Sequence, residues 1–295
     1  MTLAITLVTE SGVWASTDHR LTAHPTGTLI TDGSVKQVVI RCPDGAALVS
    51  YTGLGRIGRI DISQWMREVL RGESRTVDET LIDLRDQATS RIGLPAQQLG
   101  IPHAFLAGAF VNGTPWAVEI KNWRPLGAFG GGIQSSFETS AIRISQPVLL
   151  GAGSGWAAVS EEDRQLLLTV SRRRPRNPQE FMKLLASVNK RAAESRKPGS
   201  RSVSSSATVV YMPPSGDSVQ HQWFGPKEEE HLAPAGFSHM LFGIDVGEMM
   251  GPLLQNFDAL RRGELSEEEF DKLSEEAARK SVQPKGRQKG SRKGS

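Results

Sequence analysis

Three pairs of short apolar runs, each joined by a turn that contains glycine, predict three β-hairpins along the chain. They lie at residues 3–8 with 13–17, at 35–41 with 46–52, and at 103–111 with 116–121. Two further short strands are expected within 124–145, around Gly130-Gly131-Gly132. The apolar runs at 148–150, 207–212 and 219–224 predict the remaining strands.

Apolar residues repeat at three to four positions between these strands, which predicts pairs of helices. The first pair follows residue 56, and its second helix begins at the capping box Thr76-Val77-Asp78-Glu79. The second pair follows residue 155, and its second helix begins with Asn177 as N-cap and Pro178 at the first position. Strands that alternate with paired helices favour an α+β fold in which two stacked antiparallel sheets lie between helical layers, a four-layer αββα sandwich.

The character of the sequence changes after Pro226. We expect one domain over residues 2–226 and a partly helical C-terminal extension over 227–280, with helices at 246–262 and 267–280. The apolar segment 237–244 is suited to docking on the chain's own surface or on a neighbouring subunit. Residues 281–295 are basic and contain a single apolar residue, Val282, so we expect a disordered tail.

Composition narrows the classes of function. No apolar run approaches the roughly 20 residues of a membrane span, and the N-terminus lacks the features of a secretory signal. The single cysteine, Cys42, suits a reducing cytoplasm. The histidines lack paired metal-ligand spacing, so neither a metal nor a cofactor is expected. Much of the basic excess lies in the final stretch, but nucleic-acid binding by the tail is less favoured than simple solvation.

The first two residues carry the candidate chemistry. Removal of Met1 leaves Thr2 with a hydroxyl and a free α-amino group, so a nucleophile and a base share one residue. The first predicted hairpin brings Asp18 back beside this end of the chain. A Met-Thr start alone is common among cytosolic proteins, and its significance depends on what accompanies it.

Four local signals occur in order along the chain: Met1-Thr2, the run Ser16-Thr17-Asp18-His19-Arg20-Leu21-Thr22, Lys36-Gln37-Val38-Val39-Ile40, and Gly151-Ala152-Gly153-Ser154-Gly155 before a helix. With the order of strands and helices, they resemble the proteasome β-subunit type of N-terminal nucleophile hydrolase. The resemblance covers about residues 2–224. It is nearest to the bacterial branches, the HslV-like peptidases and the ancestral β-subunit group known as Anbu.

The resemblance implies a role for each matching residue. Thr2 matches the nucleophile, Lys36 the lysine whose charge favours attack by the hydroxyl, and Asp18 the acid that positions this lysine. Ser154 matches the serine near the α-amine, and the backbone N–H of Ser50 matches the oxyanion donor. Substrate-pocket walls are expected at Leu21, Leu48 and Thr52.

The sequence departs from the family pattern between the fourth helix and the next strand. The family usually has an Asp there with a Ser three residues later, whereas residues 194–203 read Glu-Ser-Arg-Lys-Pro-Gly-Ser-Arg-Ser-Val. Glu194 and the serines of this stretch are the candidate substitutes. Two smaller departures are Leu3 after the nucleophile and Ser50 in place of a glycine.

The expected function is that of a threonine-type peptidase or amide hydrolase in the cytoplasm. Resemblance implies self-association into rings or helical stacks that enclose the sites and admit peptides or unfolded proteins. The C-terminal extension is a candidate contact for an ATPase or another partner. Two alternatives stay open: a catalytically silent scaffold subunit of the same fold, and a hydrolase of a small non-peptide amide.

Overall fold

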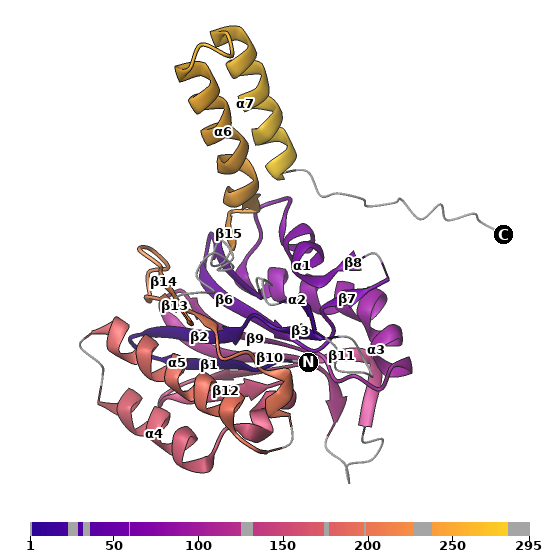
Figure 1. Ribbon diagram of the computed structural model, residues 1–295, viewed down its shortest axis with the longest axis vertical. Helices are drawn as coiled ribbons and strands as arrows, with labels where there is room; N and C mark the ends of the chain where they lie inside the picture. Colours follow the sequence, from indigo (N-terminus) through magenta and orange to yellow (C-terminus); the bar gives the residue numbers. More distant parts are fainter. Residues whose placement is uncertain are drawn as a thin grey trace, which may run out of the picture.

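The computed structural model describes residues 2–22, 29–31, 36–58, 60–124, 132–173, 177–197, 199–226 and 238–282. Two large sheets form its centre, and the chain alternates between strands and helices (Figure 1). No helix within the described ranges has the length and apolar character needed to cross a membrane.

The five-stranded sheet has the order β12-β1-β2-β13-β14, and all of its pairings are antiparallel. Its strands are β1 (Ala4–Thr9), β2 (Gly12–Asp18), β12 (Val148–Ala152), β13 (Ala207–Met212) and β14 (Gln220–Phe224). The first expected hairpin is therefore confirmed as β1–β2. Its residues are buried along the whole length of both strands, because one sheet face packs on helices and the other on the second sheet.

The seven-stranded sheet has the order β11-β10-β9-β6-β5-β15-β16. Its strands are β5 (Gln37–Cys42), β6 (Gly45–Thr52), β9 (Ala104–Val111), β10 (Thr114–Arg124), β11 (Gly132–Arg143), β15 (Ser238–Leu241) and β16 (Ile244–Asp245). The second and third expected hairpins are confirmed as β5–β6 and β9–β10. Short two-stranded ladders join β3 (Leu21–Thr22) to β4 (Leu29–Thr31) and β7 (Arg56–Ile57) to β8 (Ile60–Asp61).

The α-helices are α1 (Ile62–Leu70), α2 (Val77–Ala88), α3 (Leu94–Gln98), α4 (Glu161–Arg172), α5 (Pro178–Glu194), α6 (Val246–Arg261) and α7 (Glu267–Val282). A π-helical turn, Thr89–Gly93, lies between α2 and α3, and 3-10 turns lie at Ser154–Ala158 and Ser200–Ser202. The expected start signals are present. Thr76 and Glu79 form the capping box of α2, and Asn177 caps α5 ahead of Pro178.

Three apolar clusters pack the helices against the sheets and the two sheets against each other. One joins α4 and α5 to the five-stranded sheet, with Trp14 against Phe181 at its centre. A second joins α1 and α2 to the seven-stranded sheet, and a third fills the space between the sheets. Figure 1 accordingly shows α4 and α5 on one side of the sheets and α1 to α3 on the other.

The stretch 124–145 was expected to hold two short strands around Gly130-Gly131-Gly132. Residues 125–131 lie outside the described residues, and residues 132–143 form one twelve-residue strand, β11. Another local expectation needs correction. The helix expected from residue 56 begins only at Ile62, because Asp61 caps it after the β7–β8 ladder. The segment 237–244 was expected to dock on the chain's own surface or on a neighbouring subunit. Its described part includes β15, which adds in parallel to β5 of the chain's own sheet, a long-range pairing that local pattern does not predict.

His103 is a buried titratable group beside the start of β9. Its side chain is 0 % exposed, and its Nδ1 accepts a hydrogen bond from Leu54 N over 3.1 Å. The ring stacks on Tyr51 with 5.9 Å between centroids. Burial lowers the pKa of His103 from 6.5 to about 3, so the folded protein holds this imidazole neutral.

This neutral histidine predicts a loss of stability in mild acid. In the unfolded chain the pKa returns to 6.5, so below that pH protons bind the unfolded state in preference to the folded state. Lowering the pH from about 8 to about 5 should reduce the free energy of unfolding by about 2 kcal/mol through His103 alone. Denaturant titration of His103→Gln, which keeps an acceptor for Leu54 N, should show a correspondingly weaker pH dependence. An equal pH dependence in both proteins contradicts the assignment.

Candidate active site

The register of three antiparallel strands brings the start of the chain to one end of the five-stranded sheet. Ala4 of β1 lies opposite Thr17 of β2 and also opposite Ala152 of β12. Continued past the strand ends, these registers place Leu3 opposite Asp18, the last residue of β2, and Thr2 one residue beyond, beside the turn that follows β12. The site is therefore a consequence of sheet register.

The turn after β12 lies directly against the backbone of Thr2. Gly155 N donates a hydrogen bond to Thr2 O over 3.3 Å. Gly153 has φ of +94°, and a Cβ added there would lie only 2.0 Å from Thr2 O. Glycine is thus required at position 153, and Ser154 is held between two residues that both approach Thr2.

Lys36 reaches the same point from the other sheet. It immediately precedes β5, and Tyr51 N donates to its carbonyl oxygen over 3.1 Å. Its Nζ donates to Thr2 Oγ1 at 2.5 Å, to the carbonyl oxygen of Arg20 at 2.7 Å and to Asp18 Oδ1 at 3.2 Å. The side chains of Lys36 and Asp18 are both 0 % exposed, so they form a buried ion pair. Its ammonium group also contacts the hydroxyl of Thr2.

Asp18 is held by four donors. Oδ1 accepts from Leu3 N at 2.9 Å as well as from Lys36. Oδ2 accepts from Arg20 N at 3.2 Å and from Ser204 N at 3.1 Å. These hydrogen bonds fix the position of the carboxylate relative to Thr2 and Lys36.

Ser154 is linked to a second serine that sequence reasoning did not single out. Ser154 Oγ lies 2.6 Å from Ser202 Oγ, and Ser202 Oγ donates to the carbonyl oxygen of Gly199 over 2.6 Å. A hydroxyl has one proton, so while Ser202 donates to Gly199 it accepts the proton of Ser154. The lone pairs of Ser154 are then directed away from Ser202.

Glu194, the other candidate for the missing acid, is not at the site. It ends α5 with its side chain 60 % exposed, and its Oε1 lies 3.8 Å from Lys190 Nζ. Within the stretch 194–204, the groups that reach the site are the hydroxyl of Ser202, which contacts Ser154, and the backbone N–H of Ser204, which contacts Asp18. The serine-rich composition was the only local signal for either group.

The remaining predicted residues lie at different places. Ser50 lies inside the seven-stranded sheet opposite Leu106, with its Oγ 3.3 Å from Thr6 Oγ1. The expected oxyanion role of the Ser50 N–H stays a prediction. Leu48 is 0 % exposed in the core between the sheets. The side chain of Leu21 falls outside the part of the chain whose side chains are described.

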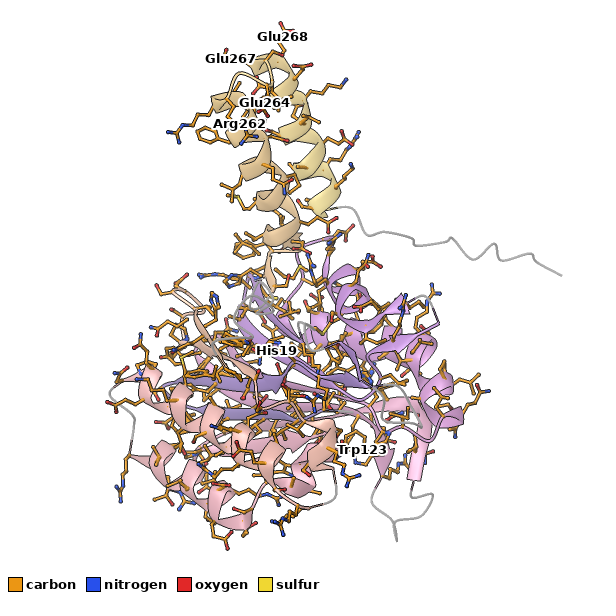
Figure 2. All side chains as sticks on the ribbon, viewed as in Figure 1. His19, Trp123, Arg262, Glu264, Glu267 and Glu268 are labelled. Carbon is orange, nitrogen blue, oxygen red and sulfur yellow. The ribbon has the colours of Figure 1, made fainter. Side chains whose placement is uncertain are left out.

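Thr52, the third expected pocket residue, lines a cavity of about 640 Å³ beside the site. Gly153 and Ser154 form the wall nearest Thr2, and Trp123 and Trp156 also line the cavity. Trp123 lies near the end of β10 and is labelled in Figure 2. Thr52 Oγ1 is buried and makes no hydrogen bond to any group in the described ranges. The cavity therefore offers aromatic surface beside Gly153 and Ser154, next to Thr2.

The assembled groups suit acyl transfer. A threonine hydroxyl in contact with a fixed ammonium group is a nucleophile whose developing negative charge has a cation beside it. The described ranges hold no group of three His, Cys, Asp or Glu side chains placed to bind a metal ion.

No protein-family model matches the sequence, and a search for similar curated proteins finds none. In structure, the chain is similar to Anbu (ancestral beta-subunit) from Yersinia bercovieri, with a TM-score of 0.52 and 12 % identity over 76 % of this chain and 88 % of that one. The chain has the fold of Anbu. Anbu from Hyphomicrobium sp. strain MC1 and Anbu in a helical assembly from Pseudomonas aeruginosa both give TM-scores of 0.49. They share 13 % and 12 % identity over 78 % of this chain and 90 % and 89 % of their own.

The likeness to Anbu from Yersinia bercovieri confirms the resemblance to Anbu drawn from the sequence. At 12 % identity, the likeness to Anbu concerns the fold, so any activity must be argued from the residues of this chain.

The Asp18–Lys36 pair predicts a large effect of a small substitution. Asp18→Asn leaves Lys36 as a buried charge without its counter-ion, and should lower the free energy of unfolding by about 3–5 kcal/mol. Chemical denaturation measures this change. The matched control is Glu138→Gln, which breaks an exposed pair with Arg124 and should have little effect. Similar small losses in both variants would contradict the importance of the buried pair.

Proposed function

We propose that this chain is an N-terminal nucleophile hydrolase that cleaves amide bonds through an ester formed on Thr2. The observation that carries the proposal is the 2.5 Å contact between Lys36 Nζ and Thr2 Oγ1 inside a buried ion pair. A lysine without such partners would be expected on the solvated surface, because ammonium groups are rarely buried unless a specific partner is present. The proposal requires that Met1 be removed.

In the proposed reaction, Thr2 supplies both nucleophile and base. Its α-amine takes the proton of Oγ1 as Oγ1 attacks the substrate carbonyl carbon, and the ordinary pKa of such an amine, about 8, leaves part of it neutral near pH 7. The positive charge of Lys36 stabilises Oγ1 as its proton leaves. The C–N bond then breaks, the leaving amine takes the proton back, and water hydrolyses the ester with the α-amine again as base.

The two-serine chain is proposed to position the α-amine. With the proton of Ser154 directed to Ser202 and that of Ser202 to Gly199, the oxygen of Ser154 is left as an acceptor. Ser154 lies in the turn that contacts the carbonyl of the same Thr2 residue, which supports a hydrogen bond from the α-amino group to Ser154. Ser202 takes the place of the acid that the family pattern has in this region.

The packing of the helices and sheets supports a division of the chain into a layered domain and a C-terminal extension. We assign residues 2–226 to a four-layer αββα domain and 227–280 to an extension, although β15 ties the start of that extension to the domain's own sheet. The expected substrate is a peptide or an unfolded chain, and the cavity lined by Thr52 and Trp123 is proposed to bind an uncharged part of it. Self-association into rings or helical stacks is proposed as the means of enclosing the sites.

Covalent labelling tests the nucleophile. A peptide epoxyketone, which reacts with both the hydroxyl and the α-amine of an N-terminal threonine, should label the mature protein once per chain. Peptide mapping should place the label on Thr2, and Thr2→Ala should abolish it. Absence of labelling in a folded protein that has lost Met1 would support the silent scaffold instead.

The same labelling experiment distinguishes a role of Lys36 in the reactivity of Thr2 from a role in folding alone. Lys36→Met should slow labelling by about 100-fold to 1,000-fold, the usual cost of one lost charge-stabilising donor. Because this variant leaves Asp18 unpaired, the double variant Asp18→Asn/Lys36→Met removes both charges and serves where the single variant does not fold. Unchanged labelling in either folded variant would overturn the proposed role of Lys36.

A comparison of peptide hydrolysis with the hydrolysis of small amides distinguishes the two enzymatic alternatives.

A further inference from the structure

The cavity beside Thr2 has walls that come from both large sheets. The edge strand β12 of the five-stranded sheet supplies Gly151 and Ala152. Strands β10 and β11 of the seven-stranded sheet supply Trp123 and Ile133. Its volume of about 640 Å³ falls within the range of ligand pockets, about 300–1,000 Å³. The cavity therefore has room for a large side chain of a bound substrate.

An irregularity in strand pairing shapes one wall of the cavity. The pairing of β10 with β11 shifts in register between Lys121 and Trp123. The buried Asn122 between them accepts a hydrogen bond from His103 N at 2.7 Å and donates one to the carbonyl oxygen of Gln134 at 3.3 Å. Irregular pairing of this kind often redirects a side chain beside a site. The shift is held by buried hydrogen bonds, so the position of Trp123 in this wall is fixed by the fold.

Trp156 forms a second aromatic wall on the side of β12. A Cβ added to Gly151 would lie 2.2 Å from the indole, so glycine at this position lets the ring rest on the strand backbone. The guanidinium carbon of Arg164 lies 4.2 Å from the ring centroid, and Arg164 Nη2 donates to the carbonyl oxygen of Trp156 at 2.8 Å. The cavity thus presents two indoles, of Trp123 and Trp156, that are in place before a ligand binds.

The charged residues among the described lining of the cavity already have partners. Glu119 accepts a hydrogen bond from Lys121, and Arg124 donates to Glu138. A charged ligand group would compete with these partners or lose its water without gaining a counter-ion. The cavity therefore favours an uncharged occupant, and the two indole rings favour an aromatic one.

The direction of the proposed reaction decides which part of a substrate reaches this cavity. The α-amine of Thr2 returns a proton to the leaving amine, so the leaving nitrogen must lie within hydrogen-bond reach of the α-amine. Ser154, which is proposed to hold the α-amine, is also a wall of the cavity, whereas Lys36 reaches Oγ1 from the entry to β5. The residue after the scissile bond begins at the leaving nitrogen. Its side chain is therefore the part of the substrate nearest to the cavity.

We propose that the cavity is the subsite for the residue that follows the scissile bond, and that it selects an aromatic side chain at this position. Trp123 and Trp156 are the residues that determine this specificity. The inference rests on the proposed hydrolysis at Thr2 and adds to it a class of substrate, namely chains that are cut before phenylalanine, tyrosine or tryptophan.

Substrate selectivity tests the subsite. Peptides that differ only in the residue after the scissile bond are compared by kcat/KM, with phenylalanine, alanine, aspartate or lysine at that position. Phenylalanine should exceed alanine by about tenfold to 100-fold, the range in which an apolar pocket distinguishes side chains, and the two charged residues should be poorer than alanine. Trp123→Ala should remove most of the preference for phenylalanine, whereas Trp123→Phe, which keeps an aromatic ring, should retain most of it.

The matched control is Trp116→Ala. Trp116 is a half-buried tryptophan near the other end of the same strand, β10, and does not line the cavity. This variant should keep the preference for phenylalanine. Equal kcat/KM for phenylalanine and alanine, a preference that Trp123→Ala leaves unchanged, or an equal loss in Trp123→Ala and Trp116→Ala would overturn the inference.

A binding measurement tests the same cavity without turnover. In the Thr2→Ala chain, isothermal titration calorimetry should show that Phe-Ala-Ala amide binds about tenfold more tightly than Ala-Ala-Ala amide. The added substitution Trp123→Ala should abolish this difference, and equal binding of the two tripeptides by Thr2→Ala would contradict the inference. Epoxyketone labelling distinguishes the two proposals. Labelling of Thr2 without an aromatic preference overturns the subsite alone, whereas absence of labelling overturns the hydrolase and with it the subsite.

Discussion

The buried ion pair between Lys36 and Asp18 is the interaction on which the candidate site depends. Each charge is removed from water, a cost that only close and fully hydrogen-bonded partners offset. Asp18 meets this condition with three backbone N–H groups besides Lys36. Lys36 meets it with a carboxylate, a carbonyl and the hydroxyl of Thr2. The arrangement is therefore stable only when the two sheets, the chain start and the loop at Ser204 are all in place.

That dependence connects fold and chemistry. β2 supplies Asp18, the entry to β5 supplies Lys36, and β12 supplies the turn around Ser154. Because the strands belong to two stacked sheets, a shift of one residue in register would reverse side-chain direction and separate these groups. The core between the sheets fixes the register, so the apolar layer at Leu48 supports the site.

The sequence predicted the features that depend on neighbouring residues. The hairpins followed from short apolar runs and glycine turns, and the starts of α2 and α5 followed from Thr76 and Asn177. The contact of Lys36 with Thr2 joins residues 34 positions apart in different sheets, and only the family resemblance indicated it. Ser202 and the Ser204 N–H were not predicted individually, because their positions depend on the path of an irregular loop. The parallel addition of β15 to β5 likewise has no local signature.

The central claim is that Thr2 is the first residue of the working protein, because only then does its α-amine stand free beside Oγ1. The direct measurement is the intact mass of the purified full-length chain, with N-terminal sequencing. The account predicts a mass that lacks Met1 and a sequence that begins Thr-Leu-Ala. Retention of Met1, or an acylated amine on Thr2, would contradict it.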